Sequence, residues 1–413
     1  MSTRPEGVPP AQSVLESPRM ARVTLRKGRV RPVWAGHPWV FAQAIARVDG
    51  APAPGDAVEV RDPEGHFLGR GFWSPKSAIP VRIVTRDPQE PLDEGAIVRR
   101  VERAAALRRQ LGLPREGTDG YRLIHAEGDG LPGLIADVYR EAAVIQLGTH
   151  GMKRYEDVIA HAVGRVSGAK TVLEVASRRA QEREGLSVEP RVIRGPERKR
   201  LEFTERGFSY AIEIELAQKT GFYFDQRENR ARIEGLARGR RVLDLYSYVG
   251  AFGLAAARGG AEIVDAWDSS APVIAEGASI AYANGLGDKV RFAKGDARRV
   301  MQKLAQDGER YDMVILDPPK LAPTAKHLAK ARKAYQRLNA SAMALVNEGG
   351  VLATCSCSAA MTEPELLRMV ALAAKDARRE ATLLAVGHQG MDHPTLPAFP
   401  EGRYLDCAFV RLT

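Results

Sequence analysis

The chain has 413 residues, of which 44% are hydrophobic and 27% are charged, a composition typical of a folded protein with two or three domains. No apolar run approaches the roughly 20 residues that a membrane helix needs, so we expect no membrane span. Three cysteines, two of them separated by one residue, cannot form a disulfide framework, which favours a reducing cytoplasm.

Positive charge is concentrated in two stretches of a chain whose net charge is +10. Neither Arg19–Arg47 nor Pro318–Asn347 contains an acidic residue, and together they carry thirteen lysines and arginines. Either stretch alone could be a solvated surface. Both together, one of them beside the candidate active site, favour a polyanionic partner.

The first two folded regions differ in pattern. Residues 1–20 lack the apolar core of a secretion signal and are expected to form a flexible tail. Residues 21–95 contain short β-rich runs separated by Gly and Pro, which predicts a small barrel or sandwich. Residues 96–200 begin with a helix and continue with strand-like runs, which predicts a small mixed α/β domain ending in a basic connection at 191–200.

The third region, residues 201–413, alternates apolar strands with helices. Strands of this kind predict a parallel sheet that is covered by helices on both faces. We therefore expect an α/β fold. The predicted strands lie within residues 241–247, 261–268, 289–296, 311–319 and 349–358.

Acidic residues end three successive strands of this predicted sheet. In open parallel sheets, ligands bind beyond the carboxyl ends of the strands. Asp244 ends the first strand and leads into the turn that contains Tyr246 and Gly250, where the glycine lets the backbone approach a ligand. Asp268 follows 24 residues later and suits ribose hydroxyls, and Asp296 suits an adenine amine.

A dinucleotide is the obvious competing ligand for such a sheet. The phosphate-binding G-x-G-x-x-G turn is absent, and a carboxylate at the start of the turn would repel a pyrophosphate. The same carboxylate can hold the amino end of a methionine moiety. This favours S-adenosylmethionine, while a purely structural strand–helix turn stays an alternative.

The fourth and fifth strands supply candidate catalytic groups. Asp317 precedes two prolines, whose fixed φ and missing N–H favour a rigid loop that directs polar groups to a substrate. Cys355 and Cys357 share a face if the fifth strand stays extended. Each could be a small buried hydrophobe, but their position at a strand end favours a nucleophile.

Methylation at C5 of cytosine requires such a nucleophile, because C5 is too electron-poor to accept a methyl group directly. A thiolate that adds to C6 makes C5 nucleophilic, and a base then removes the C5 proton so that the thiolate leaves. Asp317 is a candidate to stabilise the adduct at N3. Lys320 is a candidate to favour the thiolate.

Several motifs resemble the bacterial RlmI-type family of 23S ribosomal RNA cytosine-5 methyltransferases. The resemblance covers nearly everything after residue 20. It is carried by GHPWVF, AEGDGLPGLIADVY, KTGFYFDQRENR, VLDLYSYVGAFG, ILDPPK, SCS and DHPTLPAFPEGRYL.

The resemblance implies an N-terminal PUA-like RNA-binding domain at 21–95, a central α/β domain at 96–200 and a Rossmann-like methyltransferase domain at 201–413. It implies S-adenosylmethionine as donor, 23S ribosomal RNA as partner and Cys357 as the family's cysteine. It also implies that Asp225, Gln226 and Arg227 lie beside the cofactor. Lys320 stands where many RNA cytosine-5 methyltransferases have a second cysteine, so the release of the thiol is open.

Two further groups of residues have both a functional and a structural interpretation. Lys326, Lys330, Lys333 and Arg337 line one face of a predicted helix, which is either solvated or a track for phosphates. Trp34, Trp39 and Phe41 can stack on bases, although barrel core is the more usual role for the last two.

A metal site and a dimer are the remaining questions. His388, Asp392 and His393 offer metal-ligand side chains, but no CxxC or HExxH accompanies them, so we expect no metal. A homodimer is left open. Two alternative functions also stay open, namely methylation of a purine nitrogen with structural cysteines and a non-catalytic role in RNA binding or ribosome assembly.

Overall fold

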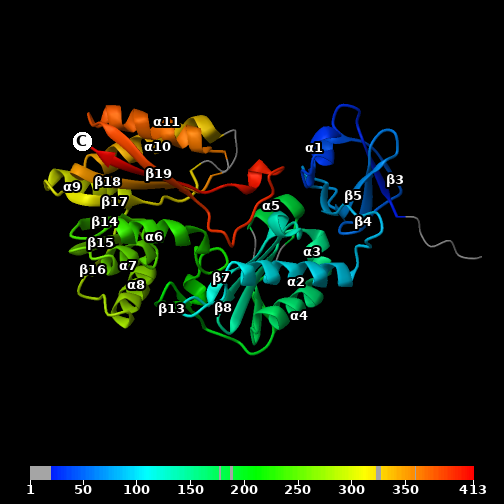
Figure 1. Cartoon of the computed structure of the whole chain (residues 1–413), viewed down its shortest axis with the longest axis horizontal. Coiled ribbons are helices and arrows are strands. Elements are labelled where there is room, and N and C mark those ends of the chain that lie inside the picture. The colour runs from blue at the N-terminus through cyan, green and yellow to red at the C-terminus, as the bar shows by residue number, and fades with distance from the viewer. Residues whose placement is uncertain (1–19, 176–177, 187–188, 322–326, 359) are drawn as a thin grey trace, which may run out of the picture.

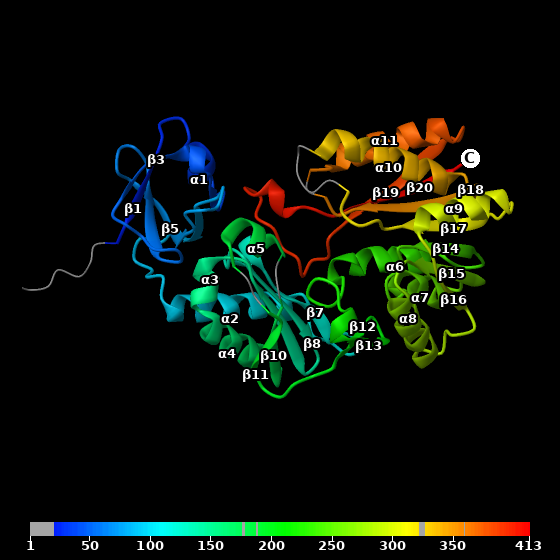
Figure 2. The same cartoon turned by 180° about the vertical axis from the view of Figure 1, so that it is seen from behind.

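The computed structural model describes residues 20–175, 178–186, 189–321, 327–358 and 360–413. The predictions for the tail up to Arg19 and for Lys326 lie outside these residues. Within them, the strands form three main sheets and a hairpin, which follow one another along the chain. Figures 1 and 2 show one sheet at the N-terminus, one in the middle and one in the C-terminal half of the molecule.

The N-terminal sheet has the order β2-β6-β5-β4-β1-β3 and confirms the predicted small β domain. Valines and leucines that alternate along β1 and β4 are fully buried between its strands, as expected where one face of each strand is buried. The strands are β1 (Arg22–Leu25), β2 (Trp39–Val40), β3 (Ile45–Asp49), β4 (Ala57–Arg61), β5 (Phe67–Trp73) and β6 (Val81–Thr85), with helix α1 (Arg31–Trp34) between β1 and β2.

The central sheet has the order β11-β10-β9-β8-β7. Its last strand, β11 (Arg191–Arg194), corrects the prediction of a mere basic connection, because it pairs antiparallel with β10 at the sheet edge. The arginines at both of its ends are exposed, which hides the strand from a search for apolar runs. The other elements are α2 (Glu94–Gln110), β7 (Gly120–His125), β8 (Leu134–Tyr139), β9 (Ala142–Leu147), α3 (His150–Arg154), α4 (Glu156–Ser167), β10 (Thr171–Glu174) and α5 (Arg178–Glu184).

A hairpin connects the central and C-terminal sheets. Strands β12 (Arg200–Glu205) and β13 (Phe208–Glu213) pair antiparallel, and β12 contacts β7 and β8. Their aromatic side chains pack with those of the following segment; the Phe203 and Tyr210 rings stack at 5.0 Å, and Phe203 meets Phe224 at 5.5 Å. This aromatic cluster fixes the segment that leads into helix α6 (Arg227–Leu236).

The C-terminal sheet has the order β16-β15-β14-β17-β18-β20-β19. Its first five strands in this order are parallel, in agreement with the predicted α/β fold. Val242 of β14 packs toward the core with α6, α7 and α8, whereas its neighbour Leu243 packs toward α9, α10 and α11. The sheet is thus covered on both faces in a Rossmann-like arrangement (Figure 1).

The elements of this sheet and its layers are β14 (Arg241–Leu245), α7 (Ala251–Arg258), β15 (Ile263–Asp268), α8 (Ala271–Ala283), β16 (Val290–Lys294), α9 (Ala297–Gln306), β17 (Tyr311–Leu316), α10 (Leu328–Met343), β18 (Val346–Ser356) and α11 (Glu363–Asp376). Two more strands, β19 (Ala381–His388) and β20 (Asp406–Leu412), are absent from the sequence prediction. They add an antiparallel pair to the edge next to β18.

Residues 389–405, which join β19 to β20, form a bridging segment between the three sheets. In Figure 1 this red segment leaves the C-terminal sheet and runs toward the N-terminal one. Its Phe399 ring lies 4.7 Å from that of Trp39, and Trp39 donates a 2.8 Å bond to Glu127 of the central domain. Trp39 and its ring neighbour Phe41 are only half-buried, so the structure corrects their assignment to the barrel core: Trp39 lies at the domain interface.

The bridging segment is also bonded to the central and C-terminal domains. Asp392 accepts hydrogen bonds from the backbone N–H of Arg122 (3.1 Å) and from Arg227 (2.8 Å). Its carbonyl accepts one from Arg108 (2.8 Å). These groups are buried, so a charged network joins the two α/β sheets. Among the described helices, none combines the length and the apolar character needed to cross a membrane.

Candidate active site

The turn after β14 has an unusual backbone. Tyr246, Tyr248 and Gly250 all have positive φ, at 62°, 53° and 77°. A Cβ at Gly250 would come within 2.5 Å of the Phe292 ring, so only glycine fits there. Two tyrosines in a conformation that L residues avoid mark a turn whose shape is imposed by its surroundings, as is common at ligand sites.

Asp244 is buried directly below this turn. Its Oδ2 accepts a 2.9 Å bond from the Gly253 N–H, while its Oδ1 has no hydrogen-bond partner among the described residues. Burial raises the pKa of this carboxyl to about 8, and the charges of Asp317 and Asp268 add to the effect. A ligand that brings a positive charge to Oδ1 would restore the ionised form.

The neighbouring strand ends carry the other two predicted aspartates. Asp268 accepts bonds from the N–H of Tyr248 (3.1 Å) and of Ser270 (3.0 Å), so it also holds the turn in place. Asp296 caps helix α9 through the N–H of Arg299 at 3.1 Å. The orphaned Nε1 of Trp267, beside Asp268, is a further buried polar atom that lacks a partner within the described chain.

These features fit S-adenosylmethionine. The donor has an ammonium and a sulfonium charge, a ribose diol and an adenine amine, and the edge offers carboxylates suited to the ammonium, the diol and the amine. The orphaned Oδ1 of Asp244 matches the need for a cationic ligand. The structure thus brings together Asp244, Tyr246, Gly250, Asp268 and Asp296 at the carboxyl ends of adjacent strands.

Asp317 follows β17, which is the next strand on the other side of β14. The Gln226 amide donates a 3.0 Å bond to its Oδ2, and Asn229 fixes that amide by a 2.6 Å bond to its oxygen. Burial raises the pKa of Asp317 to about 6, the charge of Asp225 adds to this, and that of Lys219 opposes it. A fraction of this carboxyl is therefore protonated near neutral pH.

Asp225 is buried beside Gln226. Its Oδ2 accepts a 2.7 Å bond from the Tyr404 hydroxyl and lies 3.9 Å from the Lys219 ammonium. Its Oδ1 is bonded to nothing in the part of the chain that is described. Burial acts to raise the pKa of Asp225, but the charges of Lys219 and His393 together with the Tyr404 bond hold it below its usual value.

Arg227 is placed differently from the two residues before it. Its guanidinium donates to Glu205 (3.2 Å), to Asp392 (2.8 Å) and to the Gly120 carbonyl (2.8 Å). All of these partners are protein groups of the domain connection. The structure therefore assigns Arg227 to the network between the domains and not to the group of Asp225 and Gln226.

The two neighbouring cysteines have different environments, which corrects the idea that both thiols face the site. Cys355 lies opposite Cys407 where β18 pairs with β20 in the apolar core, and burial raises the pKa of its thiol well above the usual value. Cys357 lies one residue beyond the end of β18 and is only half-buried. In the register of β17 and β18, Leu316 lies opposite Thr354, so both Asp317 and Cys357 follow at the same edge.

The charge at Cys357 is set by several neighbours. Burial raises the pKa of its thiol, and the charges of Asp317 and Asp225 raise it further. The charges of Lys219 and Lys320 lower it. The sequence interpretation named Lys320 and assigned no role to Lys219. The place of Lys219 in the motif KTGFYFDQR, six residues before Asp225, is the only signal of such a role that the sequence offered.

Helix α10 has the predicted two faces. Ala331, Tyr335, Leu338 and Ala342 are buried in the core, while Lys330, Lys333 and Arg337 are exposed. The helix follows the loop of Asp317, so its basic face begins close to the candidate site in the sequence. Trp34, at the end of α1, is 74% exposed and open to a stacking partner.

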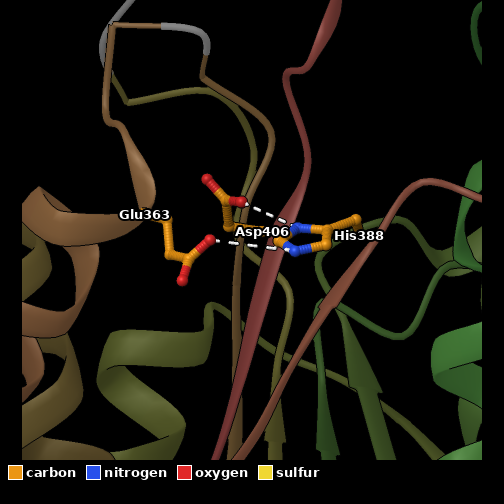
Figure 3. A group of neighbouring side chains, drawn as sticks. All are labelled: Glu363, His388 and Asp406. Atoms are coloured by element: carbon orange, nitrogen blue, oxygen red, sulfur yellow. Dashed lines mark hydrogen bonds and ion pairs between the residues drawn. The ribbon is translucent and has the colours of Figure 1, made fainter. Parts of the chain in front are cut away.

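Of the predicted ligand-type residues, Asp392 and His393 contact each other at 2.9 Å, whereas His388 belongs to a different group. His388 faces Asp406 at 3.1 Å and Glu363 at 3.7 Å (Figure 3). Arg403 bonds the same two carboxylates, with its Nη2 2.5 Å from Glu363 and 3.5 Å from Asp406. Both Arg403 and His388 therefore contact the two carboxylates, and the four residues form an ion-pair cluster.

Comparison with known proteins assigns two regions of the chain. Residues 23–86 match the family model of a PUA-like domain, and residues 134–400 match that of an S-adenosylmethionine-dependent methyltransferase. The ribosomal RNA large subunit methyltransferase I of Shewanella denitrificans is 38% identical over 95% of this chain and 99% of its own length. The protein of the same name from Aeromonas salmonicida is 36% identical over 94% and 98%.

Solved structures show the same fold at lower identity. A Streptococcus mutans protein assigned as a SAM-dependent methyltransferase matches with a TM-score of 0.81 and 19% identity, over 95% of this chain and all of that one. A second solved structure, assigned as a methyltransferase in complex with S-adenosylhomocysteine, matches this chain with a TM-score of 0.82 and 19% identity. Given these matches, the chain belongs to the S-adenosylmethionine-dependent methyltransferases, in the family of the ribosomal RNA large subunit methyltransferase I proteins.

Proposed function

We propose that this methyltransferase modifies C5 of a cytosine in 23S ribosomal RNA through a covalent bond between Cys357 and C6 of the base. The observation that carries the proposal is the difference between the two thiols. Cys355 is buried against Cys407, whereas Cys357 leaves the sheet at the edge that carries Asp317 and is partly accessible. The names of the relatives and the PUA-like domain support ribosomal RNA as substrate.

The chemistry requires a nucleophile for C6, an acid that faces N3 and a base for the C5 proton. The Cys357 thiolate forms a bond to C6, and the electron pair of the C5–C6 double bond moves so that C5 attacks the methyl group. S-adenosylmethionine supplies that electrophilic methyl group when it is bound. A base then takes the C5 proton, the double bond re-forms and the C6–S bond breaks, which returns the thiolate.

Asp317 is proposed as the group at N3. With a pKa near 6 it exists in both protonation states around neutral pH, so it can donate to N3 in the adduct and accept afterwards. Gln226 holds its Oδ2 by the 3.0 Å bond, which leaves Oδ1 for the base. Lys320, three residues on, supplies positive charge to the same loop.

The donor is proposed to lie along the ends of β14, β15 and β16. Asp244 would hold the amino group and Asp268 the ribose, while Asp296 would face the adenine amine. Tyr246 and Gly250 shape the turn that passes between them. Asp225 and Gln226 are proposed to lie beside the methionine end, because Gln226 is bonded to Asp317.

The RNA is proposed to contact the basic face of α10 and the N-terminal domain. Lys330, Lys333 and Arg337 would neutralise phosphates and supply affinity without sequence choice. Trp34 offers an exposed ring on which an unpaired base can stack.

The decisive experiment compares two cysteine variants. Cys357→Ala should abolish both methylation of cytosine and covalent trapping by RNA that contains 5-fluorocytosine. Cys355→Ala removes a thiol that faces the core and should retain trapping. If Cys357→Ala methylates RNA at the wild-type rate, the target is an atom that needs no thiol adduct, such as a purine nitrogen. If the wild type binds the donor and labels no RNA, the chain is a binding or assembly factor.

A further inference from the structure

A lysine outside the strand-end loops lies within the candidate site. Lys219 belongs to the turn between the β12–β13 hairpin and α6, and its ammonium is 3.9 Å from Oδ2 of Asp225 and 4.4 Å from the centre of the Tyr223 ring. Asp225 is followed by Gln226, which bonds Asp317. The lysine thus places a positive charge against a buried carboxylate of the site.

The backbone around Lys219 is held on both sides. Gln218 and Gly221 form a bridge with a 2.8 Å backbone hydrogen bond, and the Thr220 carbonyl accepts a 3.1 Å bond from the buried Tyr139 hydroxyl. The Thr220 hydroxyl also donates to Asp137. A Cβ at Gly221 would lie 2.5 Å from that same tyrosine hydroxyl, so the turn packs too closely against the tyrosine to admit a larger residue there.

Lys219 itself has a φ of 56°, which a lysine rarely adopts. Such a conformation is unfavourable for a lysine and persists only where the surroundings impose it. The side chain is about half-exposed at 49%, so burial of its stem does not account for this unfavourable backbone conformation. The imposed conformation instead directs the ammonium toward Asp225, whose neighbour Gln226 bonds Asp317 at the edge that also carries Cys357.

We propose that Lys219 is the positioning cation of the reaction site, which balances Asp225 and Asp317 and favours the thiolate of Cys357. This inference rests on the proposed function only in taking Cys357 as the nucleophile. In the adduct cycle the thiolate forms before the bond to C6 and again when that bond breaks. A fixed positive charge nearby favours the charged sulfur at both stages.

Other charged and titratable groups also face the thiol. They come from the segment before α6, from the loop after β17 and from α10: Tyr223, Asp225, Asp317, Lys320 and Tyr335. Two of these are carboxylates that disfavour the thiolate, and Lys219 counters them. Lys219 acts more strongly on the thiol than Lys320 does.

The test measures the thiol directly and needs no RNA. The rate of Cys357 alkylation by iodoacetamide is followed against pH in the full chain by mass spectrometry of the peptide. Cys355 and Cys407 are fully buried and serve as internal references. Lys219→Gln should slow alkylation at neutral pH by about 3- to 10-fold and move the profile to higher pH, because each pH unit changes the thiolate fraction tenfold.

Three further variants decide the outcome. Lys219→Arg should restore most of the wild-type profile, Lys320→Gln should shift it less than Lys219→Gln, and the exposed Lys303→Gln on α9 should leave it unchanged. A Lys219→Gln profile identical to the wild type, or a larger shift in Lys320→Gln, would overturn the inference. Failure of the proposed function is a separate result, since Cys357→Ala would then still methylate RNA whatever the alkylation profile.

Discussion

The hydroxyl of Tyr404 donates a 2.7 Å hydrogen bond to Oδ2 of Asp225, although 179 positions separate the two residues in the chain. Tyr404 belongs to the bridging segment, whose Phe399 packs on Trp39 of the N-terminal domain and whose Asp392 bonds Arg227. One segment therefore connects the PUA-like domain, the central domain and a carboxylate of the candidate site.

The first prediction concerns this bond. Tyr404→Phe should destabilise the protein by about 1.5–3 kcal/mol, the range for a hydrogen bond to a charged group. The folded-state pKa of Asp225 lies below its usual value, so its stabilising contribution is present at neutral pH and is lost as the pH falls through the folded pKa. Urea unfolding should show a larger difference between variant and wild type at pH 7 than in acid. Tyr282→Phe, at an 83% exposed position, should leave the stability unchanged both at pH 7 and in acid.

The second prediction concerns Asp244. Its pKa of about 8 in the folded protein lies above the pKa near 4 of an aspartate in an unfolded chain. The protein without bound S-adenosylmethionine should therefore lose stability as the pH rises from about 4 to 8. Asp244→Asn should flatten this dependence in thermal unfolding, with Asp288→Asn on the surface as control. The same variant should bind S-adenosylmethionine at least tenfold more weakly in calorimetry, because Oδ1 no longer offers a negative charge. Unchanged affinity would remove Asp244 from the donor site.

The third prediction tests the network between the domains. Asp392→Asn should cost about 3–5 kcal/mol in urea unfolding, because the buried Arg227 then has only the Glu205 carboxylate, which it shares with Arg230. The arginine and His393 hold the pKa of Asp392 well below its usual value, so this contribution persists into acid. Asp307→Asn removes the partner of the exposed Lys303 and should cost no more than about 1 kcal/mol. Equal effects of both variants would contradict a structural role for the network.

The fourth prediction concerns the basic face of α10. The double variant Lys330→Glu and Lys333→Glu should weaken binding of an RNA fragment at least tenfold and lower the slope of affinity against salt by about 0.7 for each phosphate contact that is lost. The double variant Lys289→Glu and Arg291→Glu, at the start of β16 on the opposite edge of the sheet, reverses the same number of charges. If both changes weaken binding equally, net charge accounts for the affinity and the face has no special role.

Local sequence determined the α/β fold and the edge on which the candidate site is built. Apolar runs separated by helical segments predict parallel strands, and a residue that directly follows such a strand must lie at its carboxyl end. The positions of Asp244, Asp268, Asp296 and Asp317 at that edge follow from this rule. The buried face of α10 could be predicted as well, because side chains three and four apart share one side of a helix.

Only the tertiary structure decided which neighbours these groups meet. Cys355 and Cys357 look equivalent in a strand pattern, but β20 covers one with Cys407 while the strand ends before the other. Arg227 follows Gln226 directly, yet its side chain turns to Asp392, 165 residues away. Contacts between residues so distant depend on how separate elements pack, and no periodicity within either segment records them. The chain alone thus fixes the edge at which chemistry can occur, and packing selects the side chains that face it.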